Sequence, residues 1–252
     1  MKRSIFLLLG LLLSACVAPL EPAVPRPTGT ETPFPTATET VVWFPPTSTP
    51  LPPTEAPTPT PLLLPELGEV TFRDIFSSGE EWTLPQTNRG QINVSGGELN
   101  VIINEPSTYL RGYREKPDLT TFFAQITAAP SLCAGRDEYG LLFRVQGGET
   151  YYRFALSCDG QVRLEKIIAG SVFTLQPWMR SASVAIGAPS ESTLQVLADN
   201  QEIRLFIDGA LQFSVRDGEI QRGSLGVFAR STGETALTVS FSDLVVREVI
   251  EK

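Results

Sequence analysis

Apolar and polar side chains alternate along the second half of this chain, and this alternation restricts the fold more than any other feature of the sequence. In residues 122–127, 141–146 and 151–157, apolar side chains recur at every second position. A period of two is typical of a strand with one buried face. Residue pairs that accept the backbone of a tight turn separate the segments: Gly96-Gly97, Gly147-Gly148, Asp159-Gly160, Asp208-Gly209 and Asp217-Gly218. The pattern predicts an all-β domain over residues 67–252, folded as an antiparallel β-sandwich.

A second region, residues 16–66, has a composition that prevents folding. Of the 21 prolines of the chain, 15 lie in residues 17–66, together with 11 threonines. Proline removes the backbone donors that helices and sheets need, and the segment has too few apolar side chains to form a core. We expect a disordered, polyproline-like linker that would reach about 150 Å if fully extended. It is either a stalk that presents the following domain or a linker with no length requirement, and the sequence leaves both open.

The first fifteen residues have the features of an export signal. Lys2 and Arg3 precede an apolar run, Ile5 to Leu13. The alternative is a retained membrane anchor, which the length of the run disfavours because a spanning helix needs about 20 apolar residues. The run ends in Leu13-Ser14-Ala15-Cys16, which resembles the lipobox of bacterial lipoproteins. The resemblance implies that residues 1–15 are a signal peptide and that Cys16 carries a diacylglycerol thioether and palmitate. The expected location is extracytoplasmic, anchored by lipid to a bacterial cell membrane or cell surface, with the envelope layer left open.

Composition excludes several classes of function. The chain has no histidine, which removes catalysis by an imidazole base and the zinc sites that contain histidine. Its net charge of −8 is the wrong sign for binding a phosphate backbone, so no nucleic-acid partner is expected. We also expect a monomer.

Cys133 and Cys158 remain once Cys16 is assigned to lipid. An even number of cysteines in an oxidising compartment predicts a disulfide, with two free thiols as the alternative. We assign no metal ligand. A structural calcium ion is left open, because related sandwiches bind calcium through loop carboxylates and four aspartates are candidates by residue type: Asp159, Asp208, Asp217 and Asp243.

Several segments together carry a resemblance to a known superfamily. They are Asp137 to Arg144, Tyr151 to Lys166, Ile203 to Gly209, Gly223 to Ala229 and Val239 to Val245. Their order resembles the concanavalin A-like lectin/glucanase superfamily, in particular the laminin-G-like and 3-keto-disaccharide-hydrolase-like jelly rolls of bacterial surface proteins. The resemblance implies a jelly-roll sandwich and carbohydrate as a partner.

Catalysis does not follow from this resemblance. Retaining glucanases of the superfamily place two glutamates on one strand in a Glu-x-Asp-x-x-Glu or Glu-x-Asp-x-Glu pattern, because the carboxylates must flank the scissile bond. Neither pattern occurs in this chain. No residue here matches a catalytic residue of the 3-keto-disaccharide hydrolases.

The polar side chains at alternate positions of the strands form a candidate ligand-binding face. If Leu141, Phe143, Val145 and Phe154 point inward, polar side chains of the opposite parity project from the other face: Gln125, Arg144, Gln146, Tyr151, Arg153, Arg163 and Glu165. Planar amides, guanidinium groups and an aromatic ring are typical of sugar-binding faces. The alternative is an ordinary solvated sheet face with cross-strand pairs such as Arg153 with Glu165. Trp82 and Trp178 are interpreted as core or loop anchors.

Three functions are therefore carried forward. The first is a surface-tethered lipoprotein that presents a non-catalytic carbohydrate-recognition sandwich. The second is a glycoside-processing hydrolase of the 3-keto-disaccharide hydrolase-like kind, and the third is a structural or protein-interaction domain of the envelope.

Overall fold

A computed structural model describes residues 66–233 and 236–250 of the chain, and all the regular structure in these residues is β. The predicted signal peptide, Cys16 and the linker up to residue 65 lie outside the described residues. No helix in the described ranges is long and apolar enough to span a membrane.

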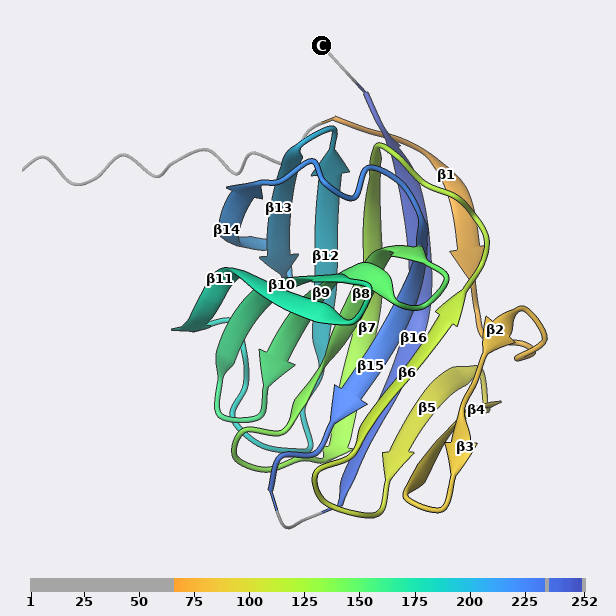
Figure 1. Cartoon of the computed structure of the whole chain (residues 1–252), viewed down its shortest axis with the longest axis vertical. Helices are drawn as coiled ribbons and strands as arrows, with labels where there is room; N and C mark the ends of the chain where they lie inside the picture. Colours follow the sequence, from red (N-terminus) through yellow and green to blue (C-terminus); the bar gives the residue numbers. More distant parts are fainter. Residues whose placement is uncertain (1–65, 234–235, 251–252) are drawn as a thin grey trace, which may run out of the picture. The chain divides into compact units, whose positions relative to one another are not determined.

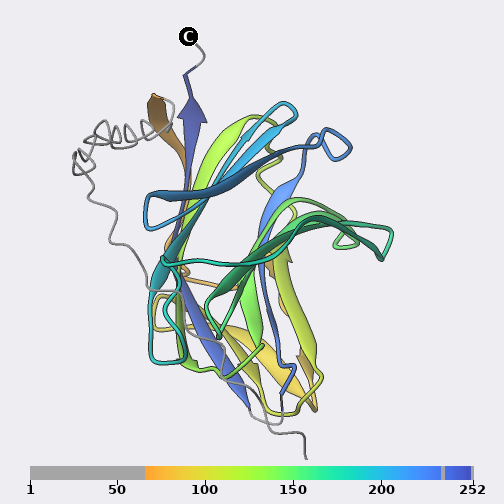
Figure 2. The ribbon, with the colours of Figure 1, turned by 90° about the vertical axis from the view of Figure 1, so that its left-hand side faces the viewer.

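The strands form two antiparallel sheets that face each other (Figures 1 and 2). A nine-stranded sheet has the order β14-β13-β12-β7-β16-β5-β4-β3, with β1 paired to β16. Its strands are β1 (Leu67–Asp74), β3 (Gln86–Thr87), β4 (Gly90–Ser95), β5 (Glu98–Ile103), β7 (Phe122–Leu132), β12 (Ser192–Asp199), β13 (Glu202–Ile207), β14 (Ala210–Arg216) and β16 (Leu237–Val249).

A seven-stranded sheet has the order β11-β10-β9-β8-β15-β6-β2. Its strands are β2 (Trp82–Thr83), β6 (Tyr109–Arg114), β8 (Glu138–Gln146), β9 (Thr150–Ser157), β10 (Gln161–Ile168), β11 (Ser171–Arg180) and β15 (Ser224–Arg230). The predicted all-β antiparallel sandwich is therefore confirmed.

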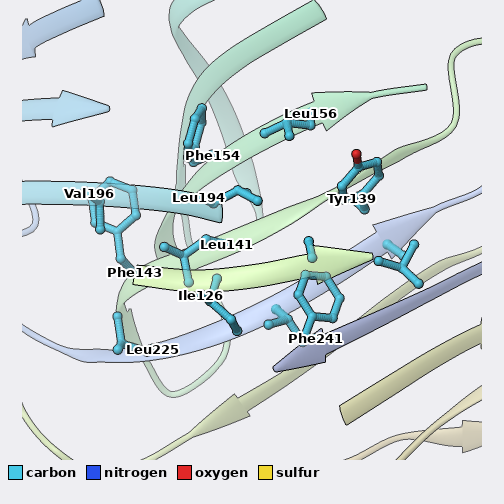
Figure 3. Packing of buried hydrophobic residues seen from close by; sticks show 14 of the residues in the cluster. Ile126, Tyr139, Leu141, Phe143, Phe154, Leu156, Leu194, Val196, Leu225 and Phe241 are labelled. Carbon is cyan, nitrogen blue, oxygen red and sulfur yellow. The ribbon is translucent and has the colours of Figure 1, made fainter. Parts of the chain in front are cut away.

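The core lies between the two sheets and follows the predicted alternation. Ile126, Leu194, Val196 and Phe241 of the nine-stranded sheet are fully buried, and they belong to one apolar cluster with side chains of the other sheet (Figure 3). The partners from the seven-stranded sheet include Tyr139, Leu141, Phe143, Phe154, Leu156 and Leu225. Each fully buried large apolar side chain contributes about 1.5–3 kcal/mol relative to exposure, so the paired inner faces hold the sandwich together.

The turns agree with the sequence at most of the predicted positions. Asp208 and Gly209 both have positive φ, 50° and 78°, and form the two-residue turn between β13 and β14. The prediction is wrong at Asp217-Gly218. These residues lie after β14 in the connection to β15. Because β15 belongs to the other sheet, a crossover between the two sheets replaces the predicted hairpin.

A β-bulge near the end of β8 also changes which side chains of this strand face the core, so part of the predicted alternation is wrong. Arg144 has a φ of 51°, and the pairing of β8 with both neighbouring strands shifts register there. The extra residue reverses the alternation, as bulges do. Val145, predicted to face the core, therefore packs with Leu142 in a separate cluster on the outer face, and Arg144 leaves that face.

Cys133 and Cys158 form a disulfide, with their Cα atoms 5.8 Å apart. It links the segment before β8 to the segment after β9. The predicted pairing is confirmed.

Candidate functional site

The outer face of the seven-stranded sheet, which is turned away from the core, has an apolar floor. Leu142, Ala155 and Phe228 are 0% exposed although they lie on this face. Tyr109, Tyr113 and Trp178 pack against them, which explains how a solvent-side sheet face keeps a dry centre. Gly140 leaves room for the Phe228 ring, because a Cβ at this position would lie 3.2 Å from the ring and 2.1 Å from the Phe154 carbonyl oxygen.

Four charged side chains form a network above this floor, and we call Glu138, Arg153, Arg163 and Glu165 the outer-face network. Arg153 Nε donates to Glu165 Oε2 at 2.9 Å, and Arg153 Nη2 contacts the same oxygen. Arg163 bridges the two acids, with Nη2 2.9 Å from Glu138 Oε2 and Nη1 3.0 Å from Glu165 Oε1. Because Glu165 and Arg153 are directly paired in the β9–β10 register, the strands themselves hold the network in place.

Burial perturbs the ionisation of this network. Desolvation raises the pKa of Glu138, against the lowering effect of Arg163. Desolvation also lowers the pKa of the Arg163 guanidinium, opposed by Glu138 and Glu165. The buried Nε of Arg163 has no hydrogen-bond partner in the described part of the chain. Burial therefore works against the charged forms of both Glu138 and Arg163, and one donor of Arg163 is left unsatisfied.

Aromatic rings surround the guanidinium groups. Arg163 Cζ lies 4.3 Å from the centre of the Trp178 ring, and Arg153 Cζ lies 5.6 Å from that of Tyr109. The hydroxyl oxygens of Tyr109 and Tyr151 are 3.1 Å apart. In cation–π contacts of this kind the guanidinium group is attracted electrostatically to the face of the ring.

A hollow of about 440 Å³ opens beside the network, where β8 and β10 begin and β9 and β15 end. We call it the rim hollow. It is lined by Arg136, Glu138, Ser157, Asp159, Gln161, Trp178, Arg230, Thr232 and Gly233. Asp137 fixes its edge, because its buried carboxylate accepts hydrogen bonds from the backbone N–H groups of Thr232 and Gly233. The hollow thus combines one large ring with hydroxyl, amide and charged groups on a rigid frame.

The structure brings together four of the seven side chains predicted for the ligand face. Tyr151, Arg153, Arg163 and Glu165 all lie on the outer face of the seven-stranded sheet. The cross-strand pair of Arg153 with Glu165, which the solvated-face alternative predicts, is also present.

The other three predicted residues lie elsewhere. Gln125 belongs to β7 of the nine-stranded sheet, where it is in register with Gln195. Gln146 follows the bulge, and its side chain donates to the Arg222 carbonyl at 2.7 Å. Arg144 is fully buried and donates to the carbonyl oxygens of Thr120, Asn200 and Ile220, so the bulge makes its predicted position on the outer face wrong.

Three of the four aspartates considered for calcium have other partners. Asp159 accepts a hydrogen bond from Gln161, Asp208 from the Thr193 N–H, and Asp217 from Tyr152. No group of three or more Cys, Asp or Glu side chains in residues 66–233 and 236–250 is arranged to hold a metal ion.

Sequence reasoning missed Tyr109, Glu138 and Trp178 as members of this surface. Trp178 follows Pro177 in an edge strand that lacks a regular alternation of apolar and polar residues. The sequence pattern therefore could not predict which face of the sheet its side chain lies on. Glu138 is separated from Gly140 and Leu142 by steps of two residues, so it lies on the same face of the strand. This spacing could have predicted that Glu138 belongs to the outer face. Trp82, in contrast, is buried in the core as expected.

Comparison with known proteins places this chain by fold alone. No protein-family model matches it, and no curated protein matches it in sequence. Many solved structures resemble it in fold, among them the following three. The carbohydrate-binding module CBM66 from Bacillus subtilis has a TM-score of 0.53 and 14% identity over 67% of this chain and 96% of that module. A Bacillus subtilis protein of unknown function with a galectin-like fold has a TM-score of 0.57 and 11% identity over 75% of this chain and 100% of the other.

The third is the catalytic domain of an endo-1,3-beta-glucanase (laminarinase) from Thermotoga petrophila, with a TM-score of 0.52 and 10% identity over 75% of this chain and 100% of that domain. At these identities the likeness defines a fold, and the described domain is an antiparallel β-sandwich with a galectin-like fold. This fold is shared by binding modules and by hydrolases, so it does not by itself assign a function.

Proposed function

We propose that this chain is a lipid-anchored surface protein whose β-sandwich binds carbohydrate at the rim hollow without cleaving it. The observation that carries the proposal is a tryptophan, Trp178, at the wall of a hollow in which Arg163 already holds the carboxylate of Glu138. Sugar sites need an apolar ring for the C–H face of a pyranose and a few fixed polar groups for its hydroxyls.

The chemistry of the lining supports a neutral or mixed-charge sugar. Ser157 and Thr232 offer hydroxyls, Gln161 offers an amide, and Arg136 and Arg230 offer guanidinium groups. Because Arg163 holds Glu138 at 2.9 Å, this carboxylate keeps one orientation before a ligand arrives. A pre-organised site loses less entropy on binding than a site that must be ordered.

The state of the carboxylates favours binding over hydrolysis. A retaining glycosidase needs one carboxylate free to attack the sugar and a second to protonate the leaving group. Glu165 is engaged by two guanidinium groups and is almost completely buried, and Glu138 is held by one of them. Neither acid is free for nucleophilic attack. Among the structural neighbours, a carbohydrate-binding module represents this kind of function.

The anchoring part of the proposal rests on sequence. Leu13-Ser14-Ala15-Cys16 supports lipidation at Cys16, and the Pro/Thr-rich residues 16–66 support a stalk. Together they support presentation of the sandwich outside the cytoplasm, at a distance from the lipid.

A glycan-array screen tests the proposal. The full chain is purified from membranes in detergent with its disulfide intact and screened with and without calcium. Saturable binding to a glycan without release of reducing ends is the expected result. Release of reducing ends would replace the proposal by a hydrolase. A blank array with capture of an envelope protein would replace it by an interaction domain.

A further inference from the structure

Arg144 is a buried cation that lacks a compensating carboxylate. It is 0% exposed, and no carboxylate oxygen lies within 4 Å of it in the part of the chain that the structure describes. Every other buried cation in that part has an acidic partner: Arg114 pairs with Asp74, Arg153 with Glu165, and Lys166 with Asp217. A buried charge without a partner is costly, so Arg144 requires an explanation.

The hydrogen bonds of Arg144 leave its charge uncompensated. Nη1 donates to the Ile220 carbonyl at 2.9 Å, and Nη2 donates to the carbonyls of Thr120 and Asn200 at 2.9 and 3.0 Å. The buried Nε has no acceptor among the described residues. Carbonyl oxygens orient the guanidinium group, but they carry only partial charge. Asp199 and Asp217 act on it from beyond 4 Å, and Asp217 is already engaged by Lys166 and Tyr152.

Arg144 is one of the residues that line a pocket of about 250 Å³, which we call the end pocket. Its lining residues are Thr120, Thr121, Arg144, Asn200, Gln201 and Gln221. The lining thus consists of two hydroxyls, three amides and one cation, with no acid, whereas the rim hollow includes Glu138 and Asp159. In a chain with a net charge of −8, this is a local site that favours an anion.

The end pocket is separate from the rim hollow. Glu138 begins β8 and Arg144 lies near its end, about 20 Å further along the strand. The end pocket is formed where the β12–β13 turn, the residues just before β7 and the segment before β15 meet.

We propose that the end pocket binds a small organic anion, specifically the carboxylate-bearing residue of an acidic sugar such as a uronate. The carboxylate supplies the missing countercharge to Arg144. The hydroxyls of the sugar pair with the amides of Asn200, Gln201 and Gln221 and with the threonine hydroxyls. The pocket volume suits one monosaccharide unit, smaller than the sites of drug-sized ligands. The end pocket and the rim hollow are independent sites, so this proposal does not rest on the first one.

The test is isothermal titration calorimetry of the full chain with sodium D-glucuronate. Its uncharged methyl ester and sodium sulfate are titrated separately. Saturable binding of glucuronate is expected, with the ester and sulfate each at least tenfold weaker. An ester that binds as tightly as glucuronate would overturn the role of charge, and sulfate that binds as tightly would overturn the sugar-acid assignment. Absence of glucuronate binding would overturn the proposal as a whole.

Arg144 itself is a poor test position because its replacement removes three structural hydrogen bonds. Gln221→Glu instead introduces a carboxylate of nearly the same shape at an exposed lining position. It should weaken glucuronate binding at least tenfold. Gln86→Glu makes the same change in charge on β3, at the far edge of the nine-stranded sheet, and should leave the affinity unchanged. Trp178→Ala should also leave it unchanged, which separates this site from the rim hollow. Unchanged affinity in Gln221→Glu, or an equal loss in Trp178→Ala, would contradict the assignment.

Discussion

Replacing Glu165 by glutamine should destabilise the protein strongly, because it removes the shared countercharge of two guanidinium groups. The side chains of Arg153 and Glu165 are only 8% and 4% exposed, so water cannot replace the lost partner. Breaking a buried ion pair from one side costs about 3–5 kcal/mol. Even the lower value changes the ratio of folded to unfolded protein more than about 100-fold.

Urea denaturation followed by tryptophan fluorescence measures this loss. With an m value of about 2 kcal/mol/M, the midpoint should fall by about 1.5 M or more. The matched control is Glu105→Gln. Glu105 pairs with Arg89 at 3.4 Å, but both side chains are more than half exposed, so the expected loss is about 0–1 kcal/mol. If Glu165→Gln lowers the midpoint no more than Glu105→Gln, the outer-face network is solvated and our account of it is refuted.

Three further predictions concern other parts of the molecule. Replacing Cys133 and Cys158 together by alanine should cost about 3 kcal/mol, measured by urea denaturation, because the 25-residue separation sets the loop entropy; an unchanged midpoint would contradict this. Burial raises the pKa of Tyr139 to about 12, so its contribution to stability is complete below pH 10 and is lost as the pH rises from 10 to 12. The urea midpoint of the wild type should therefore fall relative to that of Tyr139→Phe over that interval, and parallel curves would refute the shift. Cys16→Ser should abolish incorporation of labelled palmitate and release the chain from membranes, and retained label would exclude lipidation at this residue.

The fold followed from sequence because the alternation and the turns are local signals. Ile126, Leu141 and Phe154 are inward in the sequence pattern and in the structure alike. The Cys133–Cys158 pair could also be predicted, because an exported chain with Cys16 assigned to lipid has only these two cysteines left.

The site was harder to predict because it depends on departures from regular alternation. One bulge at Arg144 moved that side chain from the outer face into the end pocket. A bulge depends on how neighbouring strands pair, which a single strand does not encode. Similarly, Trp178 meets Arg163 only through the irregular pairing of β10 with β11. Cross-strand pairing of Arg153 with Glu165, in contrast, could be inferred from the Asp159-Gly160 turn that aligns the two strands.

Binding of carbohydrate at the rim hollow is tested most directly by three affinities. They are the affinities of the wild type, Trp178→Ala and Phe173→Ala for a glycan identified on the array. Phe173 lies on the same strand and is half exposed, but it does not line the hollow. We predict that Trp178→Ala weakens binding at least tenfold, since a stacked aromatic contributes about 1 kcal/mol or more beyond the apolar area that it buries. Phe173→Ala should bind like the wild type. Equal affinities for all three proteins would contradict binding of carbohydrate at the rim hollow.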